Sequence, residues 1–229
     1  FADFLERVSW EGAVFFYHGE GAELIAETFN DGGLLNEKAL SQYHVAVRKP
    51  VMTSFMDTLV YSNPAPSVGG TLIIFLLRIL EEGKMQNIQI PDIVQAMAVT
   101  NNARHEICIN PNDEYQINQL LEKEIFSGYI AKFLSETRKF NDKNPMPGRG
   151  STTHVSVIDK ELNAASVTTT NGEGCGYILP GTGIMLNNML GEEDLNPLGF
   201  HQWAHPMRLP TMMSPSIIMK EKKPFILLG

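Results

Sequence analysis

The spacing of apolar residues predicts helices through most of the first 140 residues. In several stretches apolar side chains recur every three or four positions, which is typical of amphipathic helices. Helices are expected in the first 29 residues, as two segments that separate near Gly19, and then at 36–43, 71–83, 91–106, 114–126 and 127–139. Asn36 is a suitable N-cap, and Pro91 and Asp92 suit a helical first turn.

Strict alternation of apolar and polar residues predicts strands in the remainder of the chain. Strands are expected at 45–50, 51–61 with a turn at Asp57–Thr58, 152–158, 164–171, and twice within 214–228 around 220–223. Because the helical patterns come mostly before the strand patterns, the sequence predicts an α+β protein in which helices cover sheets.

The strand pattern at 152–158 begins in an unusual context. A linker rich in proline and glycine covers residues 140–150, and hydroxyl residues follow it at Ser151 and Thr152. Cleavage between these two residues would free an α-amine beside the Thr152 hydroxyl. An α-amine with a pKa near 8 is partly unprotonated at neutral pH, so it can accept the hydroxyl proton. The pattern therefore suits an amidase whose nucleophile is its own N-terminal threonine.

Composition excludes several other functions. The net charge of −8, without a basic run interleaved with aromatic residues, argues against nucleic-acid binding. The apolar run 72–80 is too short to span a bilayer and contains Arg78. Cys108 and Cys175 do not make a disulfide framework, and we expect both to be small buried apolar residues.

Several motifs in the chain resemble one enzyme family. Thr-Thr-His-x-Ser-Val-x-Asp at 152–159, the Asn163–Ala164 turn with its threonine-rich strand, and Gly-Ile-Met-Leu-Asn-Asn at 183–188 resemble the start of the small subunit of the γ-glutamyltransferases. The stretch 48–70, from Arg-Lys-Pro to Ser-Val-Gly-Gly, resembles a segment of the large subunit of that family. The resemblance covers essentially the whole chain.

The resemblance implies the αββα sandwich of the N-terminal-nucleophile hydrolases, here in part. It implies self-cleavage at Ser151–Thr152, with 1–151 as the mostly helical end of a large subunit and 152–229 as the β-rich start of a small subunit. The two subunits would stay together as a heterodimer. Substrates would be γ-glutamyl amides such as glutathione, with water or an amino compound as acceptor, and neither cofactor nor metal is expected. The family resemblance suggests a periplasmic or extracellular location.

The resemblance also suggests the residues of the site. The first threonine, Thr152, would be the nucleophile, and the hydroxyl of Thr170 would bond to it. The remaining candidates would bind substrate: Asn171, Glu192 with Glu193 and Asp194 behind it, and Thr211. In the family an acidic residue at the place of Glu192 holds the α-ammonium group of the substrate.

Three positions depart from the family pattern and favour an alternative. Gly172 stands where the family has a substrate-binding asparagine, Met189 replaces a frequent glutamine, and Pro210 lies where a serine pair is expected. An acylase that acts on glutaryl or cephalosporin-type side chains is therefore the alternative enzyme. A catalytically silent, unprocessed homologue is the alternative of a different class.

Other signals in the sequence are weak. A dinucleotide site at the glycines of 172–176, a metal site at His201 and His205, a triad built on His154, and a nucleophilic Cys175 all lack the partners such sites need. Both ends of the chain interrupt a pattern, so we expect it to be part of a longer protein. Residues 1–229 alone are expected to stay uncleaved and inactive, because the family's oxyanion glycines and carboxylate-binding arginine would lie beyond them.

Overall fold

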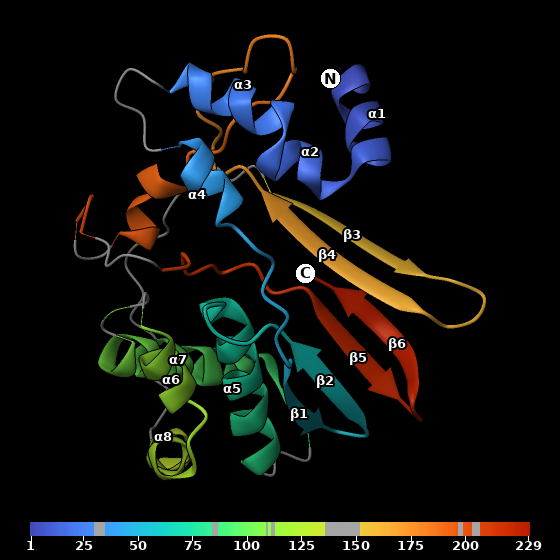
Figure 1. Cartoon of the computed structure of the whole chain (residues 1–229). Helices are drawn as coiled ribbons and strands as arrows, with labels where there is room; N and C mark the ends of the chain where they lie inside the picture. Colours follow the sequence, from blue (N-terminus) through green and yellow to red (C-terminus); the bar gives the residue numbers. More distant parts are fainter. Residues whose placement is uncertain are drawn as a thin grey trace. The chain divides into compact units, whose positions relative to one another are not determined.

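Figure 1 shows the computed structural model, which describes residues 1–29, 35–83, 87–108, 110, 113–135, 152–196, 199–202 and 207–229. The predicted linker 140–150, Ser151 and His205 lie outside these residues. Helices and sheets are both present, so the prediction of an α+β protein is confirmed. The chain forms two compact units, Phe1–Val47 with Asn171–Asn188, and Arg48–Thr170 with Met189–Gly229.

The first unit is built on short helices. They are α1 (Ala2–Glu11), α2 (Ala13–His18), α3 (Glu20–Thr28) and α4 (Glu37–Ser41). The predicted break at Gly19 is confirmed, but a second break at Gly12 divides the segment that precedes it. Gly12 has a φ of 70°, a left-handed conformation that glycine adopts without steric cost. The predicted cap is also confirmed, because the Asn36 side chain accepts a hydrogen bond from the Ala39 amide.

The loop 171–188 belongs to this helical unit because it contributes to its core. Leu179 is buried together with Ala22, Ile25 and Leu40. The Leu179 amide and the Ile184 carbonyl form a hydrogen bond of 2.8 Å, which closes the loop around the buried side chain. The glycine-rich sequence is therefore an ordered part of this unit.

The second unit has a larger helical layer. Its helices are α5 (Val68–Glu82), α6 (Ile90–Ile107), α7 (Glu114–Gln119) and α8 (Lys123–Ser135). Phe75 on α5 is completely buried, and its ring lies edge-on to Phe126 at 5.2 Å and to Tyr129 at 5.8 Å. Ile79 and Ile117 extend the same core.

A four-stranded antiparallel sheet packs against α5, in the order β1-β2-β5-β6. Its strands are β1 (Val51–Phe55), β2 (Thr58–Ser62), β5 (Ser216–Lys220) and β6 (Lys223–Leu228). The turn between β1 and β2 is at Met56–Asp57, one residue earlier than predicted. The strand predicted at 45–50 is wrong. Val45 and Val47 are exposed there, and alternation alone cannot form a strand without a partner.

The remaining two strands form a ribbon, β3 (Thr152–Ile158) with β4 (Ala164–Thr170). The Ser166 hydroxyl donates to the Leu228 carbonyl at the end of β6. A Cβ atom at Gly229 would overlap the His154 ring and the Thr168 hydroxyl. Since these side chains share one face of the ribbon, that face packs against the end of β6 (Figure 1). The unit thus layers helices, a sheet and a second sheet, as in part of an αββα sandwich.

Candidate active site

Thr152 and Thr170 face each other at the open end of the ribbon. The antiparallel register places these two residues directly opposite each other. The Thr152 hydroxyl donates to the Thr170 hydroxyl at 3.2 Å. This distance is longer than the common value of about 2.7–2.8 Å for hydrogen bonds between hydroxyl groups. The bond is therefore weak, and its main effect is to orient the two hydroxyl groups. Thr152 is exposed and Thr170 is half-buried, so the expected pair is formed at an accessible place.

A row of polar side chains continues along the same face. His154 Nδ1 lies 2.8 Å from the Thr168 hydroxyl, and His154 Nε2 lies 2.8 Å from the Ser156 hydroxyl. Each ring nitrogen therefore faces a hydroxyl group. The histidine links the two strands next to the threonine pair, which is a structural arrangement and not the acid–base triad that the sequence also disfavoured.

Asn171, the next predicted residue, belongs to the other compact unit. Its carbonyl accepts hydrogen bonds from the Gly174 and Asn188 amides. The Asn188 side chain in turn accepts from the Glu173 amide at 2.8 Å. The backbone of Asn171 therefore closes the glycine-rich loop onto the Asn187–Asn188 pair.

The acidic candidates lie on a tightly folded segment of the second unit. Two single-turn 3-10 helices, η1 (Met189–Gly191) and η2 (Glu193–Leu195), flank Glu192. Glu192 is half-buried, whereas Glu193 is exposed. The side chain of Asp194 lies outside the described residues. The Glu192 side chain is therefore less accessible to water than the Glu193 side chain.

Thr211 lies where two distant segments meet. Its carbonyl accepts from the Val68 amide at 2.9 Å, and its hydroxyl accepts from the Met213 amide at 3.0 Å. Ser67, the N-cap of α5, donates to the Met213 carbonyl at 2.9 Å. We call residues 66–70 with 211–214 the seam. A Cβ atom at Gly69 would overlap the Met212 carbonyl, so glycine allows the close approach.

The seam and Asn196 are features that sequence reasoning missed. Asn196 is buried, and its side-chain amide donates to the Leu190 and Glu192 carbonyls. A polar residue in an irregular stretch carries no periodic signal. The Ser67-x-Gly69-Gly70 pattern at the start of a helix can be seen in the sequence. The segment that it contacts, 211–214, lies more than 140 positions later, so the sequence does not show the contact.

The two cysteines differ from each other. Burial raises the pKa of the Cys108 thiol to about 11, so this residue is inert as expected. Cys175 is exposed, which corrects the prediction that both are buried. Its sulfur accepts a hydrogen bond from the Tyr177 amide in the glycine-rich loop.

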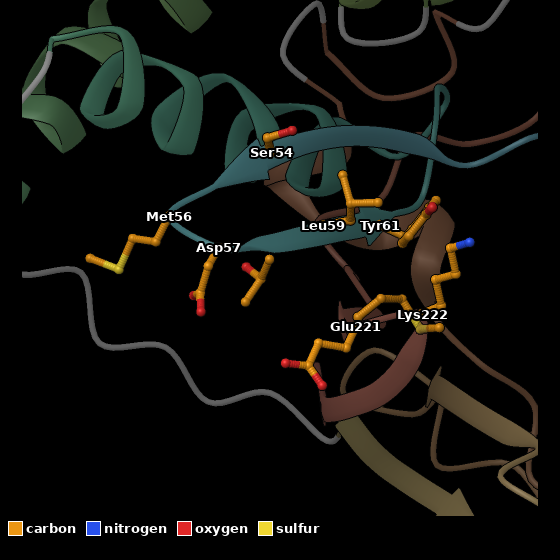
Figure 2. Close-up of a pocket in the computed structure, with 9 residues that line it drawn as sticks. Ser54, Met56, Asp57, Leu59, Tyr61, Glu221 and Lys222 are labelled. Carbon is orange, nitrogen blue, oxygen red and sulfur yellow. The ribbon is translucent and has the colours of Figure 1, made fainter.

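One hollow of about 470 Å³ lies on the four-stranded sheet (Figure 2), and none of the predicted site residues lines it. It is lined by Ser54, Met56, Asp57, Thr58, Leu59, Tyr61, Met219, Glu221 and Lys222. Lys220 binds Asp57 at 2.6 Å and lowers the pKa of that carboxyl group. In the described part of the chain, no cluster of three or more His, Cys, Asp or Glu side chains could hold a metal ion. None of the described helices is long and apolar enough to cross a membrane.

A comparison with known protein families identifies the family of this chain. The model of the gamma-glutamyltranspeptidase family matches residues 1–229. The chain belongs to this family. The glutathione hydrolase proenzyme of Escherichia coli is 30% identical over 98% of this chain, and the acylase ACY 1 proenzyme of a Pseudomonas species is 27% identical over 100% of this chain.

A solved structure agrees with this family assignment at the level of the fold. The cephalosporin acylase of Bacillus halodurans superposes on 99% of the chain with a TM-score of 0.71, at 20% sequence identity. The chain spans 43% of the length of the two curated relatives and 42% of this acylase chain. This chain therefore corresponds to less than half of each of these proteins. Over the part that it covers, it has the same fold as the solved acylase.

Proposed function

We propose that the complete protein cleaves itself at Ser151–Thr152 and then hydrolyses or transfers γ-glutamyl groups through Thr152. The observation that supports this most is the Thr152 hydroxyl at the first position of β3, 3.2 Å from the hydroxyl of Thr170. Family membership and relatives named as proenzymes add to it. Ser151 lies outside the described residues, so the proposal uses only the geometry on the Thr152 side.

Cleavage would follow from the chemistry of a hydroxyl next to its own amide. The Thr152 oxygen attacks the Ser151 carbonyl carbon, its proton passes to the Thr152 nitrogen, and the C–N bond between the two residues breaks as an ester forms. Water then hydrolyses this ester. Ser151 leaves with a carboxylate, and Thr152 keeps a free hydroxyl and gains an α-amine.

The new amine would act as the base in turnover. It takes the Thr152 hydroxyl proton while the oxygen attacks the γ-carbonyl carbon of the donor, and it returns the proton to the departing amine. The acyl group is now an ester of Thr152. Water releases it as glutamate, or an amino acceptor takes it as a new amide. The Thr170 hydroxyl would orient the attacking oxygen throughout.

Mass spectrometry and activity of the complete protein test this proposal. We expect two chains, of which the smaller begins Thr-Thr-His-Val-Ser, and release of p-nitroaniline from γ-glutamyl-p-nitroanilide. Thr152→Ala should leave one inactive chain. Thr153→Ala is the matched control, because alternation points Thr153 to the opposite face, and it should still be cleaved and active. Cleavage of the Thr152→Ala protein would overturn the proposal.

An acylase for glutaryl side chains is the second candidate. The ACY 1 and cephalosporin acylase relatives favour it, as do Gly172 and Met189. A glutaryl group lacks the α-ammonium group, so the two functions differ in whether an acid binds that charge. If Glu192 does so, Glu192→Gln should lower kcat/KM for the γ-glutamyl anilide by about 30- to 1,000-fold and spare the glutaryl anilide.

Two further variants make this second test specific. Glu161→Gln changes an exposed acid in the turn between β3 and β4 and should affect neither substrate. If only Glu193→Gln has the effect expected of Glu192, Glu193 is the partner of the ammonium group. Turnover of the glutaryl anilide alone, insensitive to both substitutions, would favour the acylase.

A further inference from the structure

The segment that carries Glu192 is hydrogen-bonded to a buried side chain, that of Asn196. Asn196 is only 7% exposed. Its Nδ2 atom donates to the Glu192 carbonyl at 2.6 Å and to the Leu190 carbonyl at 3.1 Å. The Asn196 amide also donates to the Glu193 carbonyl at 2.9 Å. One residue thus makes contacts with the backbone before, at and after Glu192.

The regular structure on either side of Glu192 is too short to hold this backbone by itself. Each of the two flanking 3-10 helices has three residues, and such single turns are not stable by themselves. Glu192 lies between them with an extended backbone, at φ −82° and ψ 127°. Its carbonyl accepts from the Leu195 amide at 3.2 Å as well as from Asn196. Through its second bond, to the Leu190 carbonyl, the Asn196 side chain also connects this backbone to η1.

The direction of a carboxylate follows the backbone that carries it. A bond to an ammonium group works over a heavy-atom distance of about 2.7–2.9 Å, so a shift of one ångström at the backbone is enough to lose it. We propose that Asn196 is a positioning residue that sets the backbone at Glu192, and thereby the preference for acyl donors that carry an α-ammonium group. This inference rests on the proposed function of Glu192.

The two anilides measure this effect in the complete, processed protein. Asn196→Ala should lower the ratio of kcat/KM for the γ-glutamyl anilide to that for the glutaryl anilide by about 5- to 30-fold, the loss expected from two buried hydrogen bonds. The change should come from a higher KM for the γ-glutamyl anilide. Kinetics on the glutaryl anilide should stay unchanged. Asn196→Ser, whose hydroxyl can donate to one carbonyl, should give an intermediate ratio.

Asn163→Ala is a matched control. Asn163 also holds a turn through its side-chain amide, which donates to Asp159 at 2.8 Å in the loop between β3 and β4. That loop is seven residues from Thr152 along β3, or roughly 23 Å. Asn163→Ala should leave the substrate ratio unchanged although it also removes a hydrogen bond from a side-chain amide.

The double variant Glu192→Gln with Asn196→Ala separates positioning from general stability. If Asn196 acts through Glu192, adding Asn196→Ala to Glu192→Gln should not change the ratio further. An equal loss on both substrates would show a structural role and overturn the inference. If Glu192→Gln lowers the ratio and Asn196→Ala does not, the inference alone fails. If Glu192→Gln leaves the ratio unchanged, the assignment of Glu192 fails and the inference fails with it.

Discussion

Phe75 and Val155 are both apolar residues in regular elements of the second unit, yet their surroundings are opposite. Phe75 is completely buried between α5, α6 and α8, whereas Val155 on β3 is 53% exposed. The helical layer buries large side chains against one another. The ribbon instead lines up hydroxyl groups and a histidine on its inner face.

The helical layer therefore mainly stabilises the unit, whereas the ribbon carries the candidate reactive groups. Burial of apolar surface contributes about 25 cal/mol per Å², so most of the stabilisation resides in the helical layer. A two-stranded ribbon is marginal by itself and depends on its contact with the end of β6. It can therefore carry reactive, exposed hydroxyl groups while the remainder of the unit holds its position. Four predictions test this division in the complete protein.

The largest effect is expected in the helical core. Phe75→Ala should lower the free energy of unfolding by about 3–5 kcal/mol, because it leaves a cavity under two aromatic rings. Val155→Ala, on the exposed face of the ribbon, should cost less than about 1 kcal/mol. Urea denaturation followed by circular dichroism measures both. Equal losses would show that the ribbon is as important for stability as the core.

The next largest effect is a loss of activity with no loss of stability, and it is expected at Thr170. Thr170→Val keeps the shape of the side chain but removes the hydroxyl that faces Thr152. We expect kcat for the γ-glutamyl anilide to fall by about 10- to 100-fold, with the urea midpoint unchanged. Steady-state kinetics on the processed enzyme gives the answer. Unchanged kcat would remove Thr170 from the catalytic pair.

A smaller effect is expected at the seam, where a polar group is buried. The Ser67 hydroxyl accepts from the Gly70 amide and donates to the Met213 carbonyl. Ser67→Ala should cost about 1–2 kcal/mol of unfolding free energy, since it removes a helix cap and leaves a carbonyl without this donor. Ser41→Ala, at an exposed serine that bonds within α4, is the control and should have almost no effect.

The smallest effect is a pH dependence at the outer turn of the ribbon. Hydrogen bonds from the Asn163 side chain and amide lower the pKa of Asp159. A carboxyl group with a lowered pKa stabilises the fold above its ordinary value near 3.8, and this contribution is lost as the pH falls through the folded-state pKa. Asn163→Ala should thus be slightly less stable than wild type at pH 7. The difference should shrink as the pH falls through the lowered pKa of Asp159, and a difference that stays constant throughout an acid titration would contradict it.

The elements follow from the sequence wherever local periodicity and burial agree. Helical spacing located α5 and α6 to within about three residues, and the polar turn at 159–163 set the register that pairs Thr152 with Thr170. The periodicity and the turn are short-range features, because spacing and turn length act within a few residues of chain. Thr152 as candidate nucleophile and Thr170 as its partner were named through the family resemblance instead.

Contacts between distant segments were decided only by the tertiary structure. Val45 and Val47 alternate as in a strand but pair with none of the described strands. Cys175 is exposed because its loop turns around Leu179. The Thr211 hydroxyl holds a turn of the seam, 144 positions after Ser67. The contacts of Asn196 could not be predicted from the sequence either, although they are short-range. Its hydrogen bonds join segments of irregular backbone, whose conformation is set by packing and which show no periodic pattern in the sequence.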